Sequence, residues 1–286
     1  MQEDDRPAAK KGVTVPQIDS NGISLNYTDS GGDGRAVVLI HGWPLSGASW
    51  SEQVPALTEA GHRVITYDRR GFGDSDKPEG GYDYDTFAAD LAGLLDGLDL
   101  KDATLVGFSM GGGEIARNIG SYGEDRVHSV VFAGAVPPYL LKTDDNPDGG
   151  LEEDAVKGME DGAREDREGF LDPFTTNFFS ADGELKVSEE QRQAALSLQA
   201  AARDEAVVGC IGAFGRTDFR NDLTRITVPT LVIHGDSDAI VPFEVSGKRT
   251  AETIDGSQLV VVEGAPHGFN VSHADEFNRA LLDFLG

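Results

Sequence analysis

The chain of 286 residues has little cysteine, little lysine and no long apolar run. Its single cysteine, Cys210, cannot form an internal disulfide, which excludes a disulfide-rich scaffold. A membrane-spanning helix needs about 18 consecutive apolar residues, and no stretch of the sequence reaches that length. Residues 1–12, MQEDDRPAAKKG, also lack the apolar core of a secretory signal. These absences predict a cytoplasmic protein that has no membrane partner.

Basic residues are also scarce: 24 Lys and Arg stand against 50 Asp and Glu, which gives a net charge of −26. Only eight of the basic residues are lysines. An acidic surface of this kind repels polyanions, so neither nucleic acid nor an anionic membrane is expected as a partner. Because like charges repel one another less when salt screens them, we interpret the composition as that of a halophilic protein from a saline cytoplasm.

The most informative stretch of the sequence is ATLVGFSMGGGEIARNI at 103–119. A short apolar run, typical of a buried parallel strand, leads into GFSMG at 107–111, and apolar residues at helical spacing follow. This is the G-x-S-x-G pattern, in which a tight turn lifts a serine hydroxyl out of a sheet. A side chain at either flanking glycine would collide with that turn. Ser109 is therefore the candidate nucleophile.

Strands and helices alternate on both sides of this motif. Short apolar runs predict buried strands at 36–40, 64–67, 103–107, 127–135, 229–234 and 258–262. Residues at amphipathic spacing predict helices between most of them. Alternating βα units imply an α/β fold with a mostly parallel, doubly wound sheet and helices on both faces.

One long segment, residues 137–222, breaks this alternation. It has acidic loops, helical spacing and no convincing strand, so we expect a helical cap inserted between strands of the sheet. The expected domains are a mobile acidic tail at 1–12, an α/β core at 13–136 and 223–286, and the cap at 137–222.

Three phenylalanines of the cap, Phe170, Phe174 and Phe178, recur at steps of four residues. This spacing places them on one side of a helix. They are expected to form the seam between the cap and the core. The alternative is that they form part of a substrate wall.

A serine hydroxyl needs a base to take its proton, and the base needs a carboxylate to orient it. In a doubly wound sheet, reactive groups gather beyond the carboxyl ends of the strands. Of the six histidines, His267 comes just beyond the last strand and is the candidate base. Its nearest competitor, His273, falls at a predicted helix start, where a surface or capping role is expected. The acid is expected in the loop after strand 229–234, where either Asp236 or Asp238 could serve.

The charge that develops on the substrate oxygen needs hydrogen-bond donors that are already in place. One candidate is the backbone N–H of Met110, directly after the nucleophile. The other is expected from the loop HGWP at 41–44, where Trp43 has an N–H and Pro44 has none. The alternative for this loop is a buried turn with a packing tryptophan.

These pieces together resemble the α/β-hydrolase superfamily and, within it, the cofactor-free haloperoxidase, aryl esterase and perhydrolase group. The resemblance covers nearly the whole chain from about residue 22. The similar segments are HGWPLSGASW (41–50), YDRRGFGDSDKP (67–78), GYDYDTFAADL (81–91), VGFSMGGGEIAR (106–117), TDFRNDL (217–223), HGDSDAIVPFE (234–244) and GAPHG (264–268).

The resemblance implies an α/β-hydrolase fold and a role for each candidate residue. The implied roles are nucleophile for Ser109, acid for Asp238 rather than Asp236, base for His267, and oxyanion donors for Trp43 and Met110. Pro44 and Phe108 are expected to line the substrate pocket. Proline directly after the oxyanion tryptophan is similar to group members that favour hydrogen peroxide over water.

The implied reaction is hydrolysis of small carboxylic esters through an acyl-serine. In the related perhydrolysis, hydrogen peroxide cleaves the acyl-serine, a peracid departs, and halide oxidation follows without haem or metal. The sequence has no phosphate loop, no Cys/His metal spacing and no G-x-G-x-x-G, so neither cofactor nor metal is expected. The expected partners are a small ester or carboxylic acid and hydrogen peroxide, and assembly into a homo-oligomer is also considered.

Other functions use the same fold. An epoxide hydrolase or haloalkane dehalogenase is disfavoured because it would need a carboxylate in place of Ser109. A lactonase or a carbon–carbon bond hydrolase would use the same triad, and only the pocket distinguishes these enzymes from an esterase. A ligand receptor is the alternative from another class, and failure of a covalent serine probe to label Ser109 would favour it.

Overall fold

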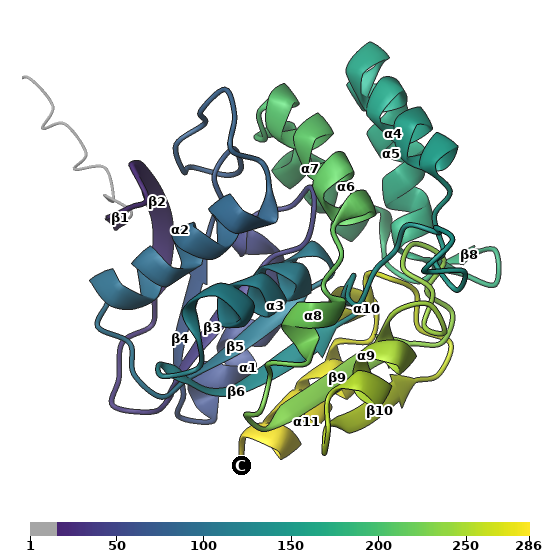
Figure 1. Ribbon diagram of the computed structural model, residues 1–286. Coiled ribbons are helices and arrows are strands. Elements are labelled where there is room, and N and C mark those ends of the chain that lie inside the picture. The colour runs from purple at the N-terminus through teal and green to yellow at the C-terminus, as the bar shows by residue number, and fades with distance from the viewer. Residues whose placement is uncertain (1–15) are drawn as a thin grey trace, which may run out of the picture.

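The computed structural model describes residues 16–286, which contain one large sheet (Figure 1). Its strands are β1 (Gln17–Ser20), β2 (Ile23–Asp29), β3 (Ala36–Ile40), β4 (Arg63–Tyr67), β5 (Ala103–Phe108), β6 (Val127–Ala133), β9 (Thr230–Gly235) and β10 (Gln258–Val262). They lie in the order β1-β2-β4-β3-β5-β6-β9-β10. β2 pairs antiparallel with β1 and β4, and all other pairs in this sheet are parallel. The predicted mostly parallel α/β sheet is confirmed.

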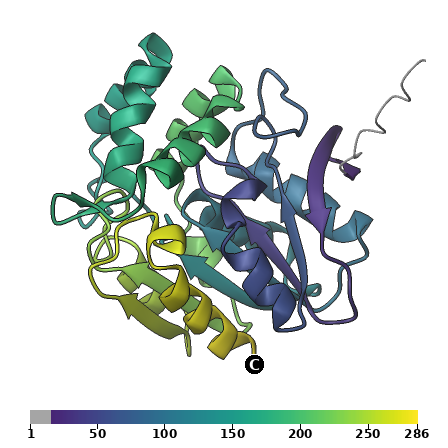
Figure 2. The same ribbon diagram turned by 180° about the vertical axis from the view of Figure 1, so that it is seen from behind.

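Helices cover both faces of the sheet. Outside the segment 137–222, the helices are η1 (Gly47–Trp50), α1 (Gln53–Glu59), α2 (Tyr84–Gly97), α3 (Met110–Tyr122), α9 (Gly247–Thr253), α10 (Phe269–Ser272) and α11 (Ala274–Leu285). α2, α3 and α9 lie on the face toward the viewer in Figure 1, and α1 and α11 lie on the opposite face, which Figure 2 shows. The doubly wound arrangement follows from this placement.

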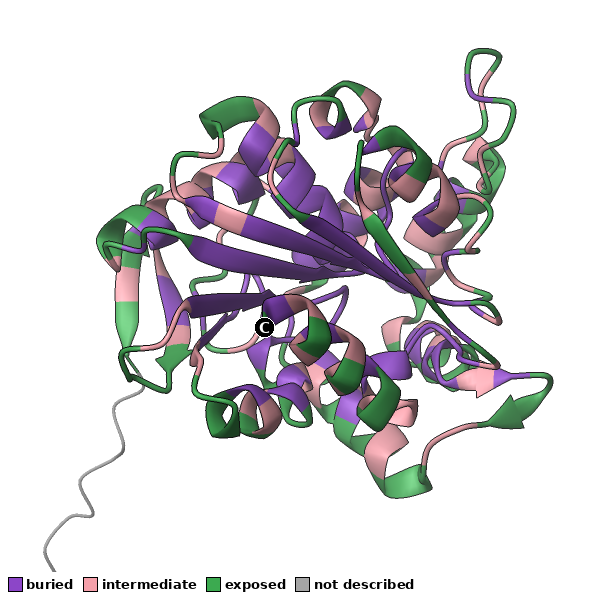
Figure 3. Cartoon of the chain, turned by 90° about the horizontal axis from the view of Figure 1, so that it is seen from below, coloured by how far each residue is buried: buried purple, intermediate pink, exposed green. Residues whose placement is uncertain are grey.

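The central strands are buried on both sides, as Figure 3 shows. All five residues of β3 are buried, which explains why the strand is a continuous apolar run rather than an alternating one. Val38 and Ile40 contact the core under α2 and α3, whereas Val37 and Leu39 contact the core under α1 and α11. Each face of the sheet therefore has its own apolar core.

The segment 137–222 joins β6 to β9 and extends beyond the sheet, at the top of Figure 1. Its helices are α4 (Glu153–Glu165), α5 (Arg167–Phe178), α6 (Glu189–Ala200), α7 (Asp204–Arg216) and α8 (Arg220–Leu223), of which the last extends one residue past the segment. Helices α4 to α7 stand beyond the carboxyl ends of the parallel strands, where the reactive groups of such folds gather, whereas α8 lies beside α3 (Figure 1).

The expectation that residues 137–222 contain no strand is wrong in one detail. A small antiparallel hairpin, β7 (Ser180–Ala181) and β8 (Glu184–Leu185), follows α5. Its turn is Asp182-Gly183, with φ of 54° and 77°. An Asp-Gly pair with both φ angles positive is a frequent two-residue hairpin turn. Strands of two residues are too short to show an alternating pattern, so this dipeptide was the sequence signal for the hairpin.

Two further expectations concern the ends of the chain. The predicted tail at 1–12 lies outside the described residues. The helix whose start was predicted at His273 is α11, which begins at Ala274, and the separate short helix α10 precedes it. His273 stands at the junction between α10 and α11, where its Nδ1 lies 2.9 Å from the hydroxyl of Ser272. It therefore has a local role at a helix start.

Candidate active site

Ser109 occupies the turn between β5 and α3, in the conformation that the sequence motif predicts. Its φ and ψ are 53° and −119°, a strained combination for a residue with a side chain. A Cβ on Gly107 would lie 2.6 Å from the carbonyl carbon of Gly111, and a Cβ on Gly111 would lie 2.5 Å from the carbonyl oxygen of Ile40. Only glycine fits at these two positions, which explains the G-x-S-x-G pattern.

His267 is the histidine that the structure places beside Ser109. It lies in the loop between β10 and α10, and its Nε2 is 2.9 Å from Ser109 Oγ. Its Nδ1 is 2.6 Å from Oδ2 of Asp238. An ionised carboxylate only accepts hydrogen bonds, so Nδ1 carries the proton and Nε2 is free to accept from the serine hydroxyl.

Asp236 and Asp238, which sequence spacing could not tell apart, have different surroundings. Asp238 is buried, and its Oδ1 accepts hydrogen bonds from the backbone N–H groups of Ile240 at 2.9 Å and Val241 at 2.8 Å. Asp236 is exposed, and its Oδ1 accepts a hydrogen bond of 2.7 Å from the N–H of Gly264. Asp238 therefore faces His267, and Asp236 ties the loop after β9 to the loop after β10.

A second histidine also faces the Asp238 carboxylate. Nε2 of His234 lies 2.8 Å from the carbonyl oxygen of Val241, so it carries a proton, and it lies 3.3 Å from Asp238 Oδ2. Burial by itself raises the pKa of the Asp238 carboxyl, but the charge of His267 and the hydrogen bonds from both histidines hold that pKa well below its usual value. The carboxylate that orients His267 is therefore ionised at neutral pH.

The loop at 41–44 passes directly over Ser109. A Cβ on Gly42 would lie 3.1 Å from the Cβ of Ser109, so the backbone here approaches the serine closely. Within residues 16–286, the N–H of Trp43 donates no hydrogen bond. Met110 is the first residue of α3, so its N–H has no acceptor within the helix. Both groups are thus free to receive a substrate oxygen.

A small apolar cavity opens beside Ser109 and His267. Its volume is about 40 Å³, measured as the space open to the centre of a water molecule, which is enough for a few waters. The segment 137–222 contributes Leu140, Leu151, Met159, Phe174 and Phe214 to its lining, and the core contributes Trp43, Val136, Ile240 and Val241. The cavity has the size and polarity that suit a short acyl chain.

The lining of this cavity does not include the expected pocket residues Pro44 and Phe108, so their place in the substrate pocket stays a prediction. Phe108 projects to the other face of β5, where its ring centroid is 5.1 Å from that of His267. Its ring belongs to the apolar core on the face of the sheet that α1 and α11 cover, and from there it packs against the ring of His267. Pro44 is buried in its loop, and the ring of Trp43, 5.5 Å from that of Phe214, forms the cavity wall instead.

The phenylalanines of α5 combine the two roles that the sequence left open. Phe170 and Phe174 pack against the Trp43 ring, with centroid distances of 6.4 and 5.1 Å, which makes them the seam with the core. Phe174 also lines the cavity. Phe178 meets the ring of His267 edge-on at 4.9 Å. The seam and the substrate wall are therefore one aromatic layer.

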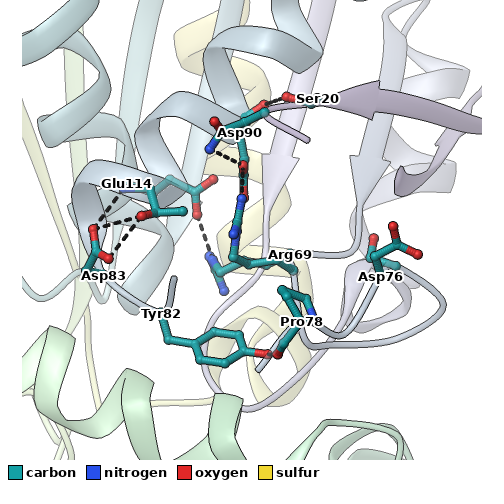
Figure 4. Close-up of polar contacts among 12 residues, drawn as sticks. Ser20, Arg69, Asp76, Pro78, Tyr82, Asp83, Asp90 and Glu114 are labelled. Carbon is teal, nitrogen blue, oxygen red and sulfur yellow. Dashed lines mark hydrogen bonds and ion pairs between the residues drawn. The ribbon is translucent and has the colours of Figure 1, made fainter. Parts of the chain in front are cut away.

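The sequence reasoning missed a buried polar network beneath the loop at 41–44. Arg69 forms an ion pair of 2.7 Å with Glu114 of α3, which Figure 4 shows, and Tyr67 donates to the same carboxylate. The side chain of Arg69 also donates to the carbonyl oxygen of His41 at 2.8 Å, and the backbone N–H of Arg69 donates to His41 Nε2 at 3.0 Å.

Burial, together with the charge of Arg69, holds the pKa of His41 well below its usual value. A neutral His41 thus accepts at Nε2 and anchors the loop. The sequence signal for this network was Glu114, a charged residue on the buried side of a predicted helix.

Replacing Glu114 with glutamine is expected to lower the free energy of unfolding by about 3–5 kcal/mol, because Arg69 would keep a buried charge without its partner. The folded fraction should also lose about 10- to 100-fold in kcat, since Arg69 holds the loop that carries Trp43. Urea unfolding and ester kinetics measure the two effects. The matched control is Asp90→Asn, which breaks the buried Arg70–Asp90 pair outside the site. Equal kcat loss in both variants would contradict a positioning role for Glu114.

No group of three or more His, Cys, Asp or Glu side chains in residues 16–286 is placed to hold a metal ion. No helix in the same residues is long and apolar enough to cross a membrane.

Comparisons with known proteins agree with this fold. A family model described as the alpha/beta hydrolase fold matches residues 35–274. The chain is 44% identical to a non-heme chloroperoxidase of Kitasatospora aureofaciens, over 93% of this chain and 97% of that protein. It is 36% identical to a bifunctional esterase/perhydrolase of Acinetobacter calcoaceticus, over 93% and 97% of the two chains. The crystal structure of a bromoperoxidase from Bacillus anthracis is similar with a TM-score of 0.90 and 56% identity, over 92% of this chain and 95% of that one.

Proposed function

Because the chain belongs to the α/β-hydrolase superfamily and, within it, to the non-haem haloperoxidase group, we propose that it hydrolyses small carboxylic esters and also forms peracids from hydrogen peroxide. The observation that carries this proposal is the hydrogen-bonded series Ser109, His267 and Asp238 at the wall of a small apolar cavity. In this proposal Ser109 is the nucleophile, His267 the base, and Asp238 the group that orients the base.

The first half of the proposed reaction is acylation. His267 Nε2 takes the proton of Ser109 Oγ as the oxygen attacks the ester carbonyl. The oxyanion that forms accepts hydrogen bonds from the N–H groups of Trp43 and Met110. Asp238 stabilises the imidazolium, which then gives its proton to the departing alcohol. The product is an acyl-Ser109 ester and a free alcohol.

The second half of the proposed reaction is the cleavage of the acyl-serine. His267 takes a proton from water or from hydrogen peroxide, and the resulting nucleophile attacks the acyl carbon. The proton then passes to Ser109 Oγ, and an acid or a peracid leaves. With a free carboxylic acid as acyl donor, acylation releases water instead of an alcohol, so acid and peroxide give peracid and water. Pro44 supports the choice of peroxide through the family resemblance.

The size of the cavity predicts which acyl groups react. A cavity with room for the centres of only a few water molecules next to Ser109 favours acetyl and propionyl groups over long chains. The kcat/KM for p-nitrophenyl esters is therefore expected to fall at least about tenfold between acetate and octanoate, which one or more misfitted methylenes readily produce. Phe214→Ala should reduce this preference, because Phe214 closes the cavity. A preference for octanoate in the wild type would contradict the proposed substrate class.

The experiment that tests the proposed function follows two products side by side. Purified protein is incubated with p-nitrophenyl acetate, and separately with acetate and hydrogen peroxide, in molar KCl. We expect ester hydrolysis in the first mixture and peracetic acid in the second, both absent from Ser109→Ala. Hydrolysis without peracid would reduce the proposal to a plain carboxylesterase. The absence of both from folded protein would favour a lactonase or a receptor.

The proposal extends to the organisation of the chain. We propose residues 13–136 and 223–286 as the catalytic core and 137–222 as its cap. In support, the cap supplies five of the cavity residues, and Nε1 of Trp43 donates a hydrogen bond of 3.0 Å to the carbonyl oxygen of Val207 in α7. The cap is therefore fastened to the loop that holds an oxyanion donor. A cytoplasmic location is also proposed, and the lone buried Cys210 supports it.

The net charge of −26 supports our proposal that the protein is halophilic. Raising KCl from about 0.15 to about 1 M shrinks the screening length from about 8 to about 3 Å, which weakens repulsion between surface carboxylates. Surface ion pairs weaken too, but each contributes only about 0–1 kcal/mol. We expect Tm to rise by about 3 °C or more, the shift that roughly 1 kcal/mol gives in a chain of this size.

A charge-reduced variant provides the control for the salt prediction. Four exposed carboxylates stand near the C-terminal ends of helices, where negative charge is unfavourable: Glu59, Glu165, Glu252 and Asp283. Their joint replacement by Gln or Asn should raise Tm at low salt and shrink the response to KCl. A wild-type Tm that stays constant or falls would contradict the halophilic interpretation. Light scattering in the same KCl series tests the further proposal that copies of the chain associate.

A further inference from the structure

The cavity beside Ser109 is lined by a residue with an oxidisable sulfur that the proposed reaction does not use. Met159, on α4, lines this cavity together with Ser109 and His267. The cavity holds only a few water-sized molecules, so any product released from Ser109 is formed in the same space as the Met159 thioether. Each turnover of the perhydrolase reaction would therefore place an oxidant against this side chain.

The other sulfurs of the described chain are shielded from that oxidant. Met110 and Cys210 have no exposed surface, and neither lines the cavity. Burial raises the pKa of the Cys210 thiol to about 12, so this residue holds no reactive thiolate at neutral pH. A thioether, in contrast, reacts through a neutral sulfur lone pair and needs no deprotonation. Met159 is thus the reactive sulfur among residues 16–286.

We propose that Met159 is a self-modification site, at which the peracid formed on Ser109 oxidises the thioether to the sulfoxide and thereby limits peracid output. The inference rests on the proposed perhydrolase function. In the step, the sulfur lone pair attacks the terminal peroxide oxygen, and the O–O bond breaks. The peracid is reduced to the carboxylic acid, which keeps the proton, and the sulfur gains one oxygen. Atoms and electrons balance without a further reactant.

The expected consequence follows from the polarity of the cavity. Its lining is apolar except for the catalytic groups, so a sulfoxide oxygen would find few hydrogen-bond donors there and would occupy space meant for the acyl group. Oxidation of Met159 should therefore slow both hydrolysis and peracid formation. Methionine sulfoxide is reduced back by methionine sulfoxide reductases, so the block is reversible. This makes Met159 a switch that responds to the enzyme's own oxidising product.

The test follows Met159 by peptide mass spectrometry during turnover of acetate and hydrogen peroxide, with peracid measured in the same sample. We expect one added oxygen on the Met159 peptide, an unmodified Met110 peptide, and about a fivefold or greater loss of ester kcat/KM, because a polar group without partners is costly in an apolar site. Treatment with methionine sulfoxide reductases should restore the rate. In Ser109→Ala, Met159 should stay unmodified in the same mixture and should become oxidised when peracetic acid is added.

The variant Met159→Leu separates oxidation of this residue from general damage. Whatever its initial rate, it should retain that rate through the turnover in which the wild type declines. Three outcomes would each overturn this inference and leave the proposed function standing. Peracid could accumulate while Met159 stays unmodified, Met159 could be oxidised as much in Ser109→Ala as in the wild type, or the rate of Met159→Leu could decline as much as that of the wild type. Absence of peracid from the wild type would instead overturn the proposed perhydrolysis and this inference with it.

Discussion

Replacing Ser109 with alanine is expected to lower kcat for p-nitrophenyl acetate by about 10⁵-fold or more, the scale on which removal of a triad nucleophile acts. The reason is local: the variant has no oxygen 2.9 Å from His267 Nε2 to form the acyl ester. Peracid formation should fall to the same degree, because both reactions pass through the same acyl-serine. Stopped-flow and steady-state assays of the purified variant measure the effect.

Two controls make the Ser109 result specific. Ser237→Ala removes a hydroxyl from the loop after β9 that contacts only Asp236 Oδ1 among its side-chain partners, at 3.1 Å, and should leave kcat within about threefold of wild type, as surface changes usually do. Urea unfolding of Ser109→Ala should show a folded protein. A Ser109→Ala variant that is folded and retains more than a hundredth of the activity would require another nucleophile.

Replacing Asp238 with asparagine is expected to lower kcat by about 10⁴-fold, because an amide oxygen and nitrogen no longer hold His267 in the tautomer that accepts from serine. The charge loss adds to this, since the buried carboxylate stabilises the imidazolium that forms during acylation. The variant should keep most of its substrate affinity, so KM should change far less than kcat. A pH series of kcat for both proteins separates a tautomer effect from unfolding.

The matched control for Asp238 lies two residues away. Asp236→Asn changes the same atoms in an exposed side chain that contacts Gly264 and Ser237, and its kcat should stay within about tenfold of wild type. Both variants replace a carboxylate with an amide, but the Asp238 carboxylate faces His267 and that of Asp236 does not. If Asp236→Asn lost far more activity than Asp238→Asn, the proposed acid would be the wrong residue.

The contrast between these two aspartates shows what sequence could reach here. The G-x-S-x-G turn is predictable because its glycines obey local geometry: any Cβ at Gly107 or Gly111 meets backbone atoms of the turn or of β3. The choice between Asp236 and Asp238 depends on the side-chain directions of a loop and on its distance to a residue 29 positions away. The spacing of residues in the sequence gives neither the side-chain directions nor this distance. The choice of Asp238 came from the family resemblance instead.

The cavity is the part of the site that local pattern could not predict. Leu151, Met159 and Phe214 belong to different elements of the segment 137–222 and meet only when that segment folds over the sheet. The expectation that Pro44 and Phe108 line the pocket came from the family resemblance. The ring of Phe108 packs against that of His267, and this contact depends on how the loop after β10 returns to β5.

The most direct test of the catalytic proposal is to trap the acyl intermediate. The wild-type protein is mixed with p-nitrophenyl acetate, quenched in acid within the first turnovers, digested and analysed by mass spectrometry. The proposal predicts one acetyl group on the peptide that contains Ser109, which disappears when hydrogen peroxide is added before the quench while peracetic acid appears. Turnover without acetylated Ser109, or an acetyl group on another residue that forms and decays at the catalytic rate, would contradict it.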